Sequence, residues 1–187
     1  EVCLGVETLR AAGSGAIALL HCTSCYPAPV DELNLAVIPA MATSLGLPVG
    51  YSDHSDGIAI SIAAVALGAS IIEKHLTLDR NLPGPDHKAS LEPDGFAAMV
   101  EGIRRVERAI GGPVKACQPS EASSRELGRR SIATARALPA GHRIGPDDLV
   151  LLRPGTGIIP RLESTVIGRT LARDVTADFL LSWADLT

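Results

Sequence analysis

The sequence has no excess of positive charge and no long apolar run. Its 17 Lys and Arg residues against 21 Asp and Glu residues give a net charge of −4, so no basic surface is expected for nucleic acid or an anionic membrane. The longest apolar stretches, such as Gly57 to Ala69, are too short and too interrupted to cross a bilayer. No basic-then-apolar leader opens the chain. The sequence therefore predicts a soluble, cytoplasmic protein without nucleic-acid or membrane partners.

Cysteines are also few. Four of them in 187 residues are too sparse for a disulfide scaffold, so we expect free thiols. Cys22 and Cys25 have the C-x-x-C spacing of redox-active motifs, but Pro27 and Pro29 delay the helix whose N-terminus would activate a thiolate. A redox function is therefore not favoured.

Hydrophobic residues make up 46% of the chain, which excludes disorder and allows one or two domains with an apolar core. The chain starts at Glu1 inside a helical pattern, so we expect it to be a piece of a longer protein. Amphipathic periodicity and continuous apolar runs predict alternating helices and strands. The helices are expected over residues 2–12, 34–45, 58–67 and 93–110, with a kink at Pro39, and the strands over 17–20, 48–51 and 70–74.

The predicted strands are continuous apolar runs, which is typical of a parallel sheet covered on both faces. The fold class is therefore α/β. Strand starts at residues 17, 48 and 70 are 31 and 22 residues apart, and such short crossovers fit a (β/α) barrel or a doubly wound sheet. Because a full barrel takes roughly 250 residues, about its first half would have to come from residues outside this chain.

The composition changes at Pro113. Lys115 to Ser124 has neither helical nor strand periodicity. Beyond it, turn signals such as Pro154-Gly155 stand at close spacing between short apolar segments, which predicts a compact, mostly β module. The predicted organisation is a partial barrel over residues 1–112, a linker over 113–124 and a small β domain over 125–187.

A histidine follows each predicted strand: His21, His54 and His75. The carboxyl ends of parallel strands form the mouth of the active site in α/β folds, and neighbouring strands lie ~4.8 Å apart. Two imidazoles there could share one metal ion and leave coordination positions open for substrate, as Lewis-acid activation of a carbonyl requires. The alternative is that one or more histidines only form hydrogen bonds inside the fold, and His21 is the weakest of the three.

Two further features carry charge at the same end of the sheet. Glu73 and Lys74 alternate in facing along their strand, so one of them points into the fold and must be paired or functional. Glu73 therefore joins His54 and His75 as a candidate catalytic residue. The loop from Asp79 to Lys88 contains two prolines and a glycine, and it would form a stiff lip presenting Asp86 to hydroxyl groups. A solvated loop is the alternative.

Four segments together resemble the sialic acid synthase family, which includes N-acetylneuraminate synthases and their legionaminate and pseudaminate relatives. They are HCTSCYPAP (21–29), GLPVGYSDHS (46–55), IIEKHLTLDRNLPGPDHKASLEPD (71–94) and RPGTGI (153–158). The resemblance runs over essentially the whole chain. It implies the C-terminal part of a (β/α)8 barrel followed by a small antifreeze-like SAF domain of β-clip type.

The resemblance also implies an activity. Enzymes of this family condense phosphoenolpyruvate with an N-acyl amino sugar, typically N-acetylmannosamine, and release phosphate and a nine-carbon 2-keto acid. His54 and His75 would hold a divalent metal ion, manganese or magnesium. The family's phosphate-binding lysines and water-activating glutamate would precede Glu1, so we expect the chain alone to be inactive.

Substrate contacts follow from the same matching. Tyr26 and Ser52 would line the substrate site, and Asp86 would bind sugar hydroxyls. Ser24 would also contact substrate, although it replaces an asparagine found in some members. Arg153 would reach from the SAF domain into the barrel of a partner subunit, which implies a domain-swapped homodimer.

Two other functions are compatible with the residues. The SAF-like part could serve a non-catalytic module that binds a sugar or a protein, or the histidines could belong to an aldolase-like metal enzyme that works without phosphoenolpyruvate. Loss of manganese binding on replacement of His54 and His75 would argue against the binding module.

Overall fold

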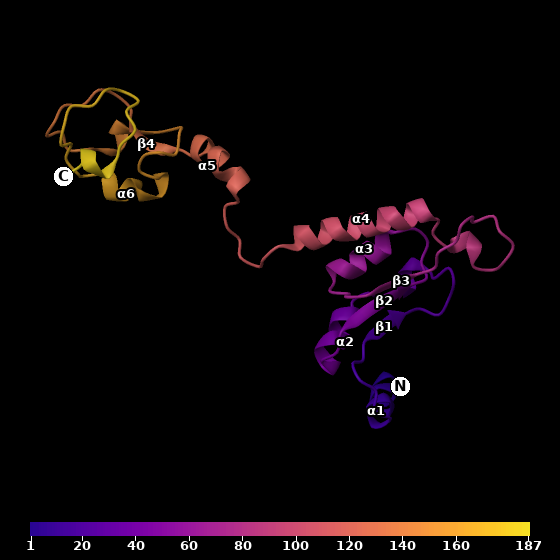
Figure 1. Ribbon diagram of the computed structural model, residues 1–187. Helices are drawn as coiled ribbons and strands as arrows, with labels where there is room; N and C mark the ends of the chain where they lie inside the picture. The colour runs from indigo at the N-terminus through magenta and orange to yellow at the C-terminus, as the bar shows by residue number, and fades with distance from the viewer. The chain divides into compact units, whose positions relative to one another are not determined.

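The structure is a computed structural model that describes residues 1–187 and divides into two compact units, Glu1–Pro113 and Val114–Thr187. Figure 1 shows the strands and the long helix α4 of the first unit, and the short elements of the second. None of the helices combines the length and the apolar character needed to cross a lipid bilayer.

The first unit alternates helices and strands along the chain. Its elements are α1 (Val2–Ala11), β1 (Leu19–Cys22), α2 (Val37–Leu45), β2 (Val49–Asp53), α3 (Ala59–Ala66), β3 (Ile72–Lys74) and α4 (Pro93–Ile110). The strands form one parallel sheet in the order β1-β2-β3. The expected parallel α/β architecture is confirmed, and α4 has the predicted bounds, with Pro93 in its first turn where no backbone N–H is needed.

Helices cover one face of this sheet. Val49 and Tyr51 of β2 pack in a buried cluster with Ile38 of α2 and Ala64 of α3. Helix α4 lies close against α3, because Gly102 leaves no side chain: a Cβ there would stand 2.5 Å from the Ile62 Cδ1 atom.

The opposite face of the sheet is open in this unit. It carries Leu20, which is 37% exposed, and the side chains of Ser52 and Glu73. The prediction of a sheet covered on both faces is therefore met on one face only.

Two element boundaries differ from the predictions. The first strand lies at Leu19–Cys22 instead of 17–20, because its pairing with Val49–Ser52 starts at Leu19. His21 therefore lies within the strand and not after it. Helix α2 begins at Val37 instead of residue 34, so Pro39 falls in its first turn and does not kink it. It ends at Gly46, whose φ of 63° is the left-handed conformation that glycine adopts easily.

The second unit has little regular structure. It contains α5 (Ala122–Gly128), β4 (Ser131–Thr134), β5 (Leu149–Leu152) and α6 (Glu163–Val166), and β4 pairs with β5 in antiparallel fashion. Isolated antiparallel bridges, such as Leu138 with Val175 and Leu171 with Leu186, join the remaining extended segments. The expectation of a mostly β module matches this arrangement. The prediction of an irregular connector up to residue 124 is wrong for its last residues, because α5 already starts at Ala122. Just before this helix, the Gln118 N–H donates a hydrogen bond to the Glu121 side chain.

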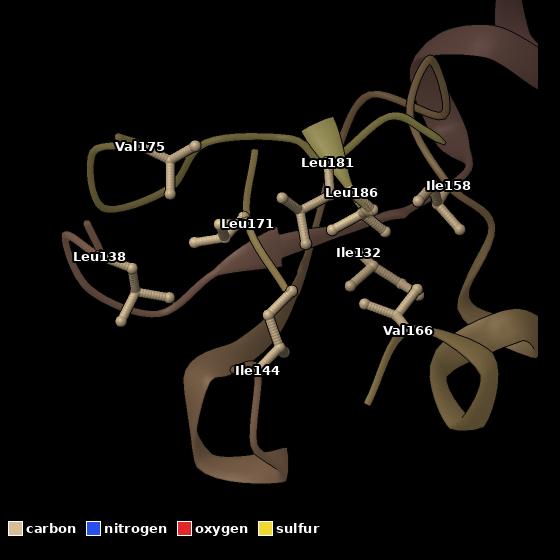
Figure 2. Close-up of a cluster of buried hydrophobic side chains, with 9 residues drawn as sticks. All are labelled: Ile132, Leu138, Ile144, Ile158, Val166, Leu171, Val175, Leu181 and Leu186. Atoms are coloured by element: carbon tan, nitrogen blue, oxygen red, sulfur yellow. The ribbon is translucent and has the colours of Figure 1, made fainter. Parts of the chain in front are cut away.

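A single apolar core holds the second unit together (Figure 2). Its buried side chains come from segments between residues 132 and 186: Ile132, Leu138, Ile144, Ile158, Val166, Leu171, Val175, Leu181 and Leu186. This core explains how short strands and bridges can form a compact unit.

Candidate functional site

Strands β2 and β3 bring His54 and His75 together. Ser52 pairs with Glu73 and Asp53 with Lys74 in the parallel register. His54 and His75 directly follow the last residues of these strands. Their ring centroids lie 5.3 Å apart and the rings are nearly perpendicular, at 83°. The structure therefore places the two predicted metal ligands side by side at the carboxyl edge of the sheet.

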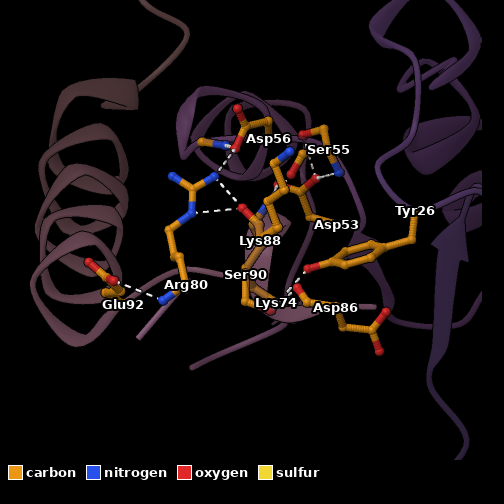
Figure 3. A network of polar contacts seen from close by, with 11 residues as sticks. Tyr26, Asp53, Ser55, Asp56, Lys74, Arg80, Asp86, Lys88, Ser90 and Glu92 are labelled. Atoms are coloured by element: carbon orange, nitrogen blue, oxygen red, sulfur yellow. Dashed lines mark hydrogen bonds and ion pairs between the residues drawn. The ribbon is translucent and has the colours of Figure 1, made fainter. Parts of the chain in front are cut away.

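A third ring, that of Tyr26, completes this cluster from the loop after β1. It stacks on the His75 ring with centroids 4.3 Å apart and meets the edge of the His54 ring at 5.2 Å. The Tyr26 hydroxyl lies 3.2 Å from the Ser90 Oγ (Figure 3). Tyr26 thus contacts both imidazoles and limits the rotation of both rings.

Ser52 and Glu73 form a second polar pair on the open face of the sheet. The buried Ser52 Oγ donates a 2.6 Å hydrogen bond to the Glu73 Oε1, whereas the Glu73 side chain is itself exposed. One carboxylate oxygen of Glu73 is therefore oriented by Ser52, and the other, Oε2, remains available to a ligand.

Lys74 points to the helical side of the sheet and has a structural role. Its Nζ lies 3.1 Å from the Asp53 Oδ2, and both side chains are fully buried. Asp53 also accepts hydrogen bonds from Ser55 and from the Ser61 Oγ of α3, while Lys74 donates to the Ser55 carbonyl (Figure 3). A buried charge pair is tolerated when its remaining hydrogen-bonding atoms are satisfied. This network fixes the two strand ends from which His54 and His75 project.

The loop after β3 is cross-linked and carries Asp86 to the edge of the cluster. The Asp86 Oδ2 lies 4.0 Å from the His75 Nδ1, and the Asp86 carbonyl accepts a 2.7 Å bond from the Ser90 Oγ. Arg80 donates to the Lys88 carbonyl and lies 3.5 Å from Asp56, so the loop is held both to itself and to the loop after β2 (Figure 3). The loop thus holds Asp86 beside His75 at the edge of the cluster.

The other three predicted residues are His21, Ser24 and Arg153. His21 directs its Nε2 to the Leu33 carbonyl at 2.8 Å and its ring to the Tyr51 ring, so it has the structural role that was its alternative. Ser24 is exposed and has no side-chain hydrogen bond. Arg153 belongs to the second unit, where its Nε donates to the Gly128 carbonyl at 3.0 Å.

Tyr51 is buried beside this site without taking part in it. Its hydroxyl has no hydrogen-bond partner. Burial, and then the nearby Asp53 and Cys22, raise the pKa of Tyr51 to about 12. The phenol therefore stays protonated at neutral pH and is not a candidate acid or base.

The spacing of the two histidine rings allows one shared divalent cation. A cation held ~2.0–2.1 Å from one nitrogen of each of two imidazoles, at a tetrahedral angle, places the ring centroids about 5 Å apart, close to the observed 5.3 Å. No group of three or more His, Cys, Asp or Glu side chains is arranged to hold a metal ion. A cation bound by His54 and His75 would therefore keep several coordination positions for substrate and water, as catalytic sites do.

Sequence reasoning missed two neighbours of the cluster. The first is Asp53. Its signal was visible in the sequence, because Asp53-His54 and Lys74-His75 each place a charged residue directly before a histidine at the ends of consecutive strands. Parallel register then makes Asp53 the partner of Lys74. The second is Cys22, whose Sγ lies 3.7 Å from the His54 Nδ1; its sequence spacing to Cys25 drew attention to the wrong pair.

The fold and the paired histidines define the class: an α/β chain of the barrel type with a candidate metal site at the ends of its strands. Residues 1–115 match the NeuB family, and residues 129–187 match the SAF domain. The chain belongs to the NeuB family. The predicted resemblance to sialic acid synthases, with the C-terminal part of a barrel followed by an SAF domain, is thereby confirmed.

Individual relatives agree with this assignment. The chain is 42% identical over 187 residues to an N,N'-diacetyllegionaminic acid synthase of Legionella pneumophila, covering 98% of this chain and 52% of that protein. It thus spans about half the length of the curated relatives it matches.

Solved structures show the same likeness. The spore coat polysaccharide biosynthesis protein SpsE of Bacillus subtilis is 37% identical with a TM-score of 0.55, over 100% of this chain and 57% of that one. An N-acetylneuraminic acid synthetase of Leptospira borgpetersenii, solved in complex with citrate, is 40% identical with a TM-score of 0.58, over 65% of this chain and 42% of that one.

Proposed function

We propose that this chain forms the metal-binding and sugar-binding part of a sialic acid synthase-type transferase. In the proposed reaction, phosphoenolpyruvate, an N-acyl amino sugar such as N-acetylmannosamine, and water give a nine-carbon 2-keto acid and inorganic phosphate. The observation that carries the proposal is the cluster of His54, His75 and Tyr26 at the carboxyl edge of a parallel sheet, in a chain whose relatives include legionaminic, pseudaminic and N-acetylneuraminate-9-phosphate synthases.

His54 and His75 would hold manganese or magnesium. When bound, such a cation polarises the aldehyde oxygen of the open-chain sugar and makes its carbon a better electrophile. Tyr26 packs against both rings, and we infer that this contact keeps the two imidazoles directed toward the same point.

Glu73 is suited to move a proton on the open face of the sheet. Condensation turns the sugar aldehyde into a hydroxyl group, which must gain a proton at the former carbonyl oxygen. The Glu73 Oε1 is engaged by Ser52, so the Oε2 is the atom that would carry and deliver this proton. A positioned acid or base of this kind contributes about 10²- to 10⁴-fold to a rate.

The remaining substrate contacts are also proposals. Asp86 lies beside His75 on a cross-linked loop, and its carboxylate would accept hydrogen bonds from sugar hydroxyls. Ser24, which is exposed in the loop after β1, would also contact substrate. Arg153 would act on the N-acyl group in the barrel of a partner subunit, so the active form would be a domain-swapped homodimer. A cytoplasmic location would suit these soluble substrates.

The open face of the sheet also bears on activity. The groups that bind phosphate and activate water would come from the remaining strands of a complete barrel, which the curated relatives are long enough to contain. We therefore expect the 187-residue chain alone to bind a cation without releasing phosphate from phosphoenolpyruvate.

Phosphate release tests the proposed function. The assay uses phosphoenolpyruvate, manganese and a panel of N-acyl hexosamines, with this chain alone and with a version that carries a complete barrel. Sugar-dependent release is expected from the complete barrel only. Glu73→Gln should lower its kcat by about 10²-fold or more, and Glu101→Gln, an exposed position on α4, is the matched control.

Three results would contradict the proposal. Sugar binding without phosphate release by the complete barrel would favour a non-catalytic binding module. Product formation without phosphoenolpyruvate would favour an aldolase-like enzyme. Equal kcat values for Glu73→Gln and Glu101→Gln would remove Glu73 from the reaction.

A further inference from the structure

Ser131 lies at the base of the loop formed by residues 153–157, which follows β5. Both ends of this loop are held on β4. Leu152 pairs with Ser131 in the antiparallel register, and the Ile132 N–H donates a 2.7 Å hydrogen bond to the Ile158 carbonyl. Ile132 and Ile158 also belong to the apolar core of the second unit (Figure 2). The two ends of the loop are therefore fixed by strand pairing and by the core.

The Ser131 hydroxyl connects two parts of this loop. Ser131 is fully buried. Its Oγ donates a 2.7 Å hydrogen bond to the Pro154 carbonyl and accepts a 2.8 Å bond from the Gly157 N–H. A hydroxyl group has a single proton to donate, so the loop backbone takes up the only donor of this side chain. The Ser131 Oγ therefore links the second residue of the loop to the fifth.

The same loop packs on the end of helix α5. The Gly155 N–H donates a 2.7 Å hydrogen bond to the Glu126 carbonyl, and the Arg153 Nε donates a 3.0 Å bond to the Gly128 carbonyl. The last carbonyls of a helix have no partner within the helix, and here the loop supplies the donors. A Cβ at Gly155 would stand 2.7 Å from the Arg129 Cβ, so this close approach requires glycine.

This packing fixes one side of the Arg153 guanidinium and leaves the other side available. The Arg153 side chain is exposed, and its terminal nitrogens form no hydrogen bond within the chain. A guanidinium presents its N–H donors in a rigid, planar fork. The bond from the Nε to the Gly128 carbonyl therefore also sets the direction of the free donors.

We propose that Ser131 is a positioning residue for Arg153. Its hydroxyl holds residues 153–157 in the observed conformation and so directs the guanidinium fork. The functional consequence rests on the proposed function, in which Arg153 binds the N-acyl group of the sugar in a partner subunit. Loss of the hydroxyl then lets the loop move and weakens sugar binding, while phosphoenolpyruvate and the cation, which Arg153 does not hold, bind as before.

Amide hydrogen exchange of the 187-residue chain tests the positioning without any assay of activity. In Ser131→Ala the Gly157 N–H loses its acceptor, so we expect it to exchange faster by about tenfold or more. The Leu138 N–H, which bonds to the Val175 carbonyl in the same unit, is the internal reference. The ratio of the Gly157 and Leu138 exchange rates corrects for any change in the stability of the whole unit.

Thr134 supplies the matched control variant. It is the last residue of β4, it is fully buried, and its Oγ1 donates a 2.6 Å hydrogen bond to the Thr176 carbonyl. Thr134→Val therefore also removes a buried hydroxyl from β4, but at the end of the strand away from the 153–157 loop. This variant should keep the exchange ratio of the parent chain.

Steady-state kinetics tests whether Ser131 acts through Arg153. In the version that carries a complete barrel, Ser131→Ala should raise the KM for the N-acyl sugar by about tenfold or more, with kcat and the KM for phosphoenolpyruvate near their parent values. Arg153→Ala should also raise the sugar KM. In the double variant, Ser131→Ala should add nothing further, because the side chain that it positions is already absent. Thr134→Val should keep the parent KM.

The outcomes separate this proposal from the proposed function. An exchange ratio that is unchanged in Ser131→Ala overturns the positioning role. So does a sugar KM that rises in Arg153→Ala but not in Ser131→Ala, or one that Ser131→Ala raises equally with and without Arg153. If Ser131→Ala speeds the exchange of Gly157 but Arg153→Ala leaves the sugar KM unchanged, or the complete barrel releases no phosphate, the hold of Ser131 on the loop stands and the proposed function fails.

Trp183 fluorescence verifies that the second unit of each variant is folded. Should Ser131→Ala not fold, Ser131→Cys replaces it in every measurement, because a thiol is a weaker donor and acceptor than a hydroxyl. The same direction of change is then expected for the exchange ratio and for the sugar KM, and parent values for both would overturn the proposal.

Discussion

The two units of this chain are stabilised in different ways. In Val114–Thr187, nine buried apolar side chains between Ile132 and Leu186 form one core. In Glu1–Pro113, the central cluster has five buried residues, and large apolar side chains remain exposed on α1 and after β3, including Leu4, Leu76 and Leu78. The second unit has the larger buried core, although Leu127 and Trp183 remain exposed, whereas the first unit carries the candidate site on a sheet that is covered on one face.

Their buried carboxylates show the same contrast. In the first unit, Asp53 is paired with Lys74, and both side chains are sealed from solvent. In the second unit, Asp148 and Asp185 pair with Arg136 and Arg173, whose side chains are about 60% exposed. Charge burial is thus complete only beside the candidate site, where two strand ends must be held in place.

Two spectroscopic signals can follow the stability of the two units separately in the same protein. Trp183 is the single tryptophan and lies in the second unit, so its fluorescence reports on that unit. Helices α1 to α4 all belong to the first unit, so far-ultraviolet circular dichroism reports mostly on that one. Each prediction below names the signal that should change and the one that should not.

The largest effect is expected for Lys74→Met. Removing one partner of a buried ion pair leaves an uncompensated charge, which costs about 3–5 kcal/mol. The urea midpoint seen by circular dichroism should fall strongly, while the Trp183 transition should stay in place. Lys88→Met, at an exposed position, is the control. A midpoint for Lys74→Met equal to that of Lys88→Met would show that the pair does not stabilise the first unit.

Acid should act on the second unit through its carboxylates. Hydrogen bonds from the Gly145 N–H, His142 and Arg136 lower the pKa of Asp148 to about 2. Burial alone would raise the pKa of Asp185, but hydrogen bonds from Ser182 and pairing with Arg173 outweigh it and lower that pKa as well.

These pKa shifts determine the direction in which stability changes with pH. Asp148 has a folded pKa of about 2, below the ~3.9 of an unfolded chain, so its stabilisation is complete above pH ~4 and is lost as the pH falls from ~4 to ~2. Asp148→Asn should lower stability at pH 7 by about 1.5–3 kcal/mol and flatten the acid dependence of the Trp183 transition. The exposed neighbour Asp147 supplies the control, Asp147→Asn. An unchanged acid profile in Asp148→Asn would contradict the assignment.

The smallest effect is expected for Tyr51→Phe. Its buried hydroxyl has no partner, and an unsatisfied buried group costs about 1 kcal/mol or more. Replacement by phenylalanine keeps the packing and should raise the midpoint seen by circular dichroism by an amount equivalent to about 1 kcal/mol. Tyr26→Phe, which loses the contact with Ser90, should not gain stability. A destabilised Tyr51→Phe variant would mean that the hydroxyl is hydrogen-bonded in solution.

Much of the fold was predictable because it depends on local patterns. The 18-residue helix α4 has strong amphipathic periodicity and a proline and two glycines at its ends, and its bounds were correct. The start of α2 was wrong because a proline within a helical pattern can stand in the first turn as well as at a kink. The position of β1 was wrong because strand ends are set by pairing with the neighbouring strand.

The candidate site was also predictable in part. His54 and His75 follow buried strands, and parallel strands bring their carboxyl ends together, so their proximity could be inferred. His21 differs because its ring lies within hydrogen-bonding distance of the Leu33 carbonyl, a contact between residues on different segments. No periodicity in the sequence predicts such a contact.

The sequence by itself determined the order of elements, the division into an α/β part and a β part, the family, and the two histidines that mark the site. Only the tertiary structure decided which charges are sealed, that Asp53 neutralises Lys74, and that the Cys22 thiol lies beside His54. The physical reason is range: apolar spacing and turn residues act over a few positions along the chain, whereas ion pairs and side-chain contacts depend on distances of 3 to 4 Å between strands that only folding brings together.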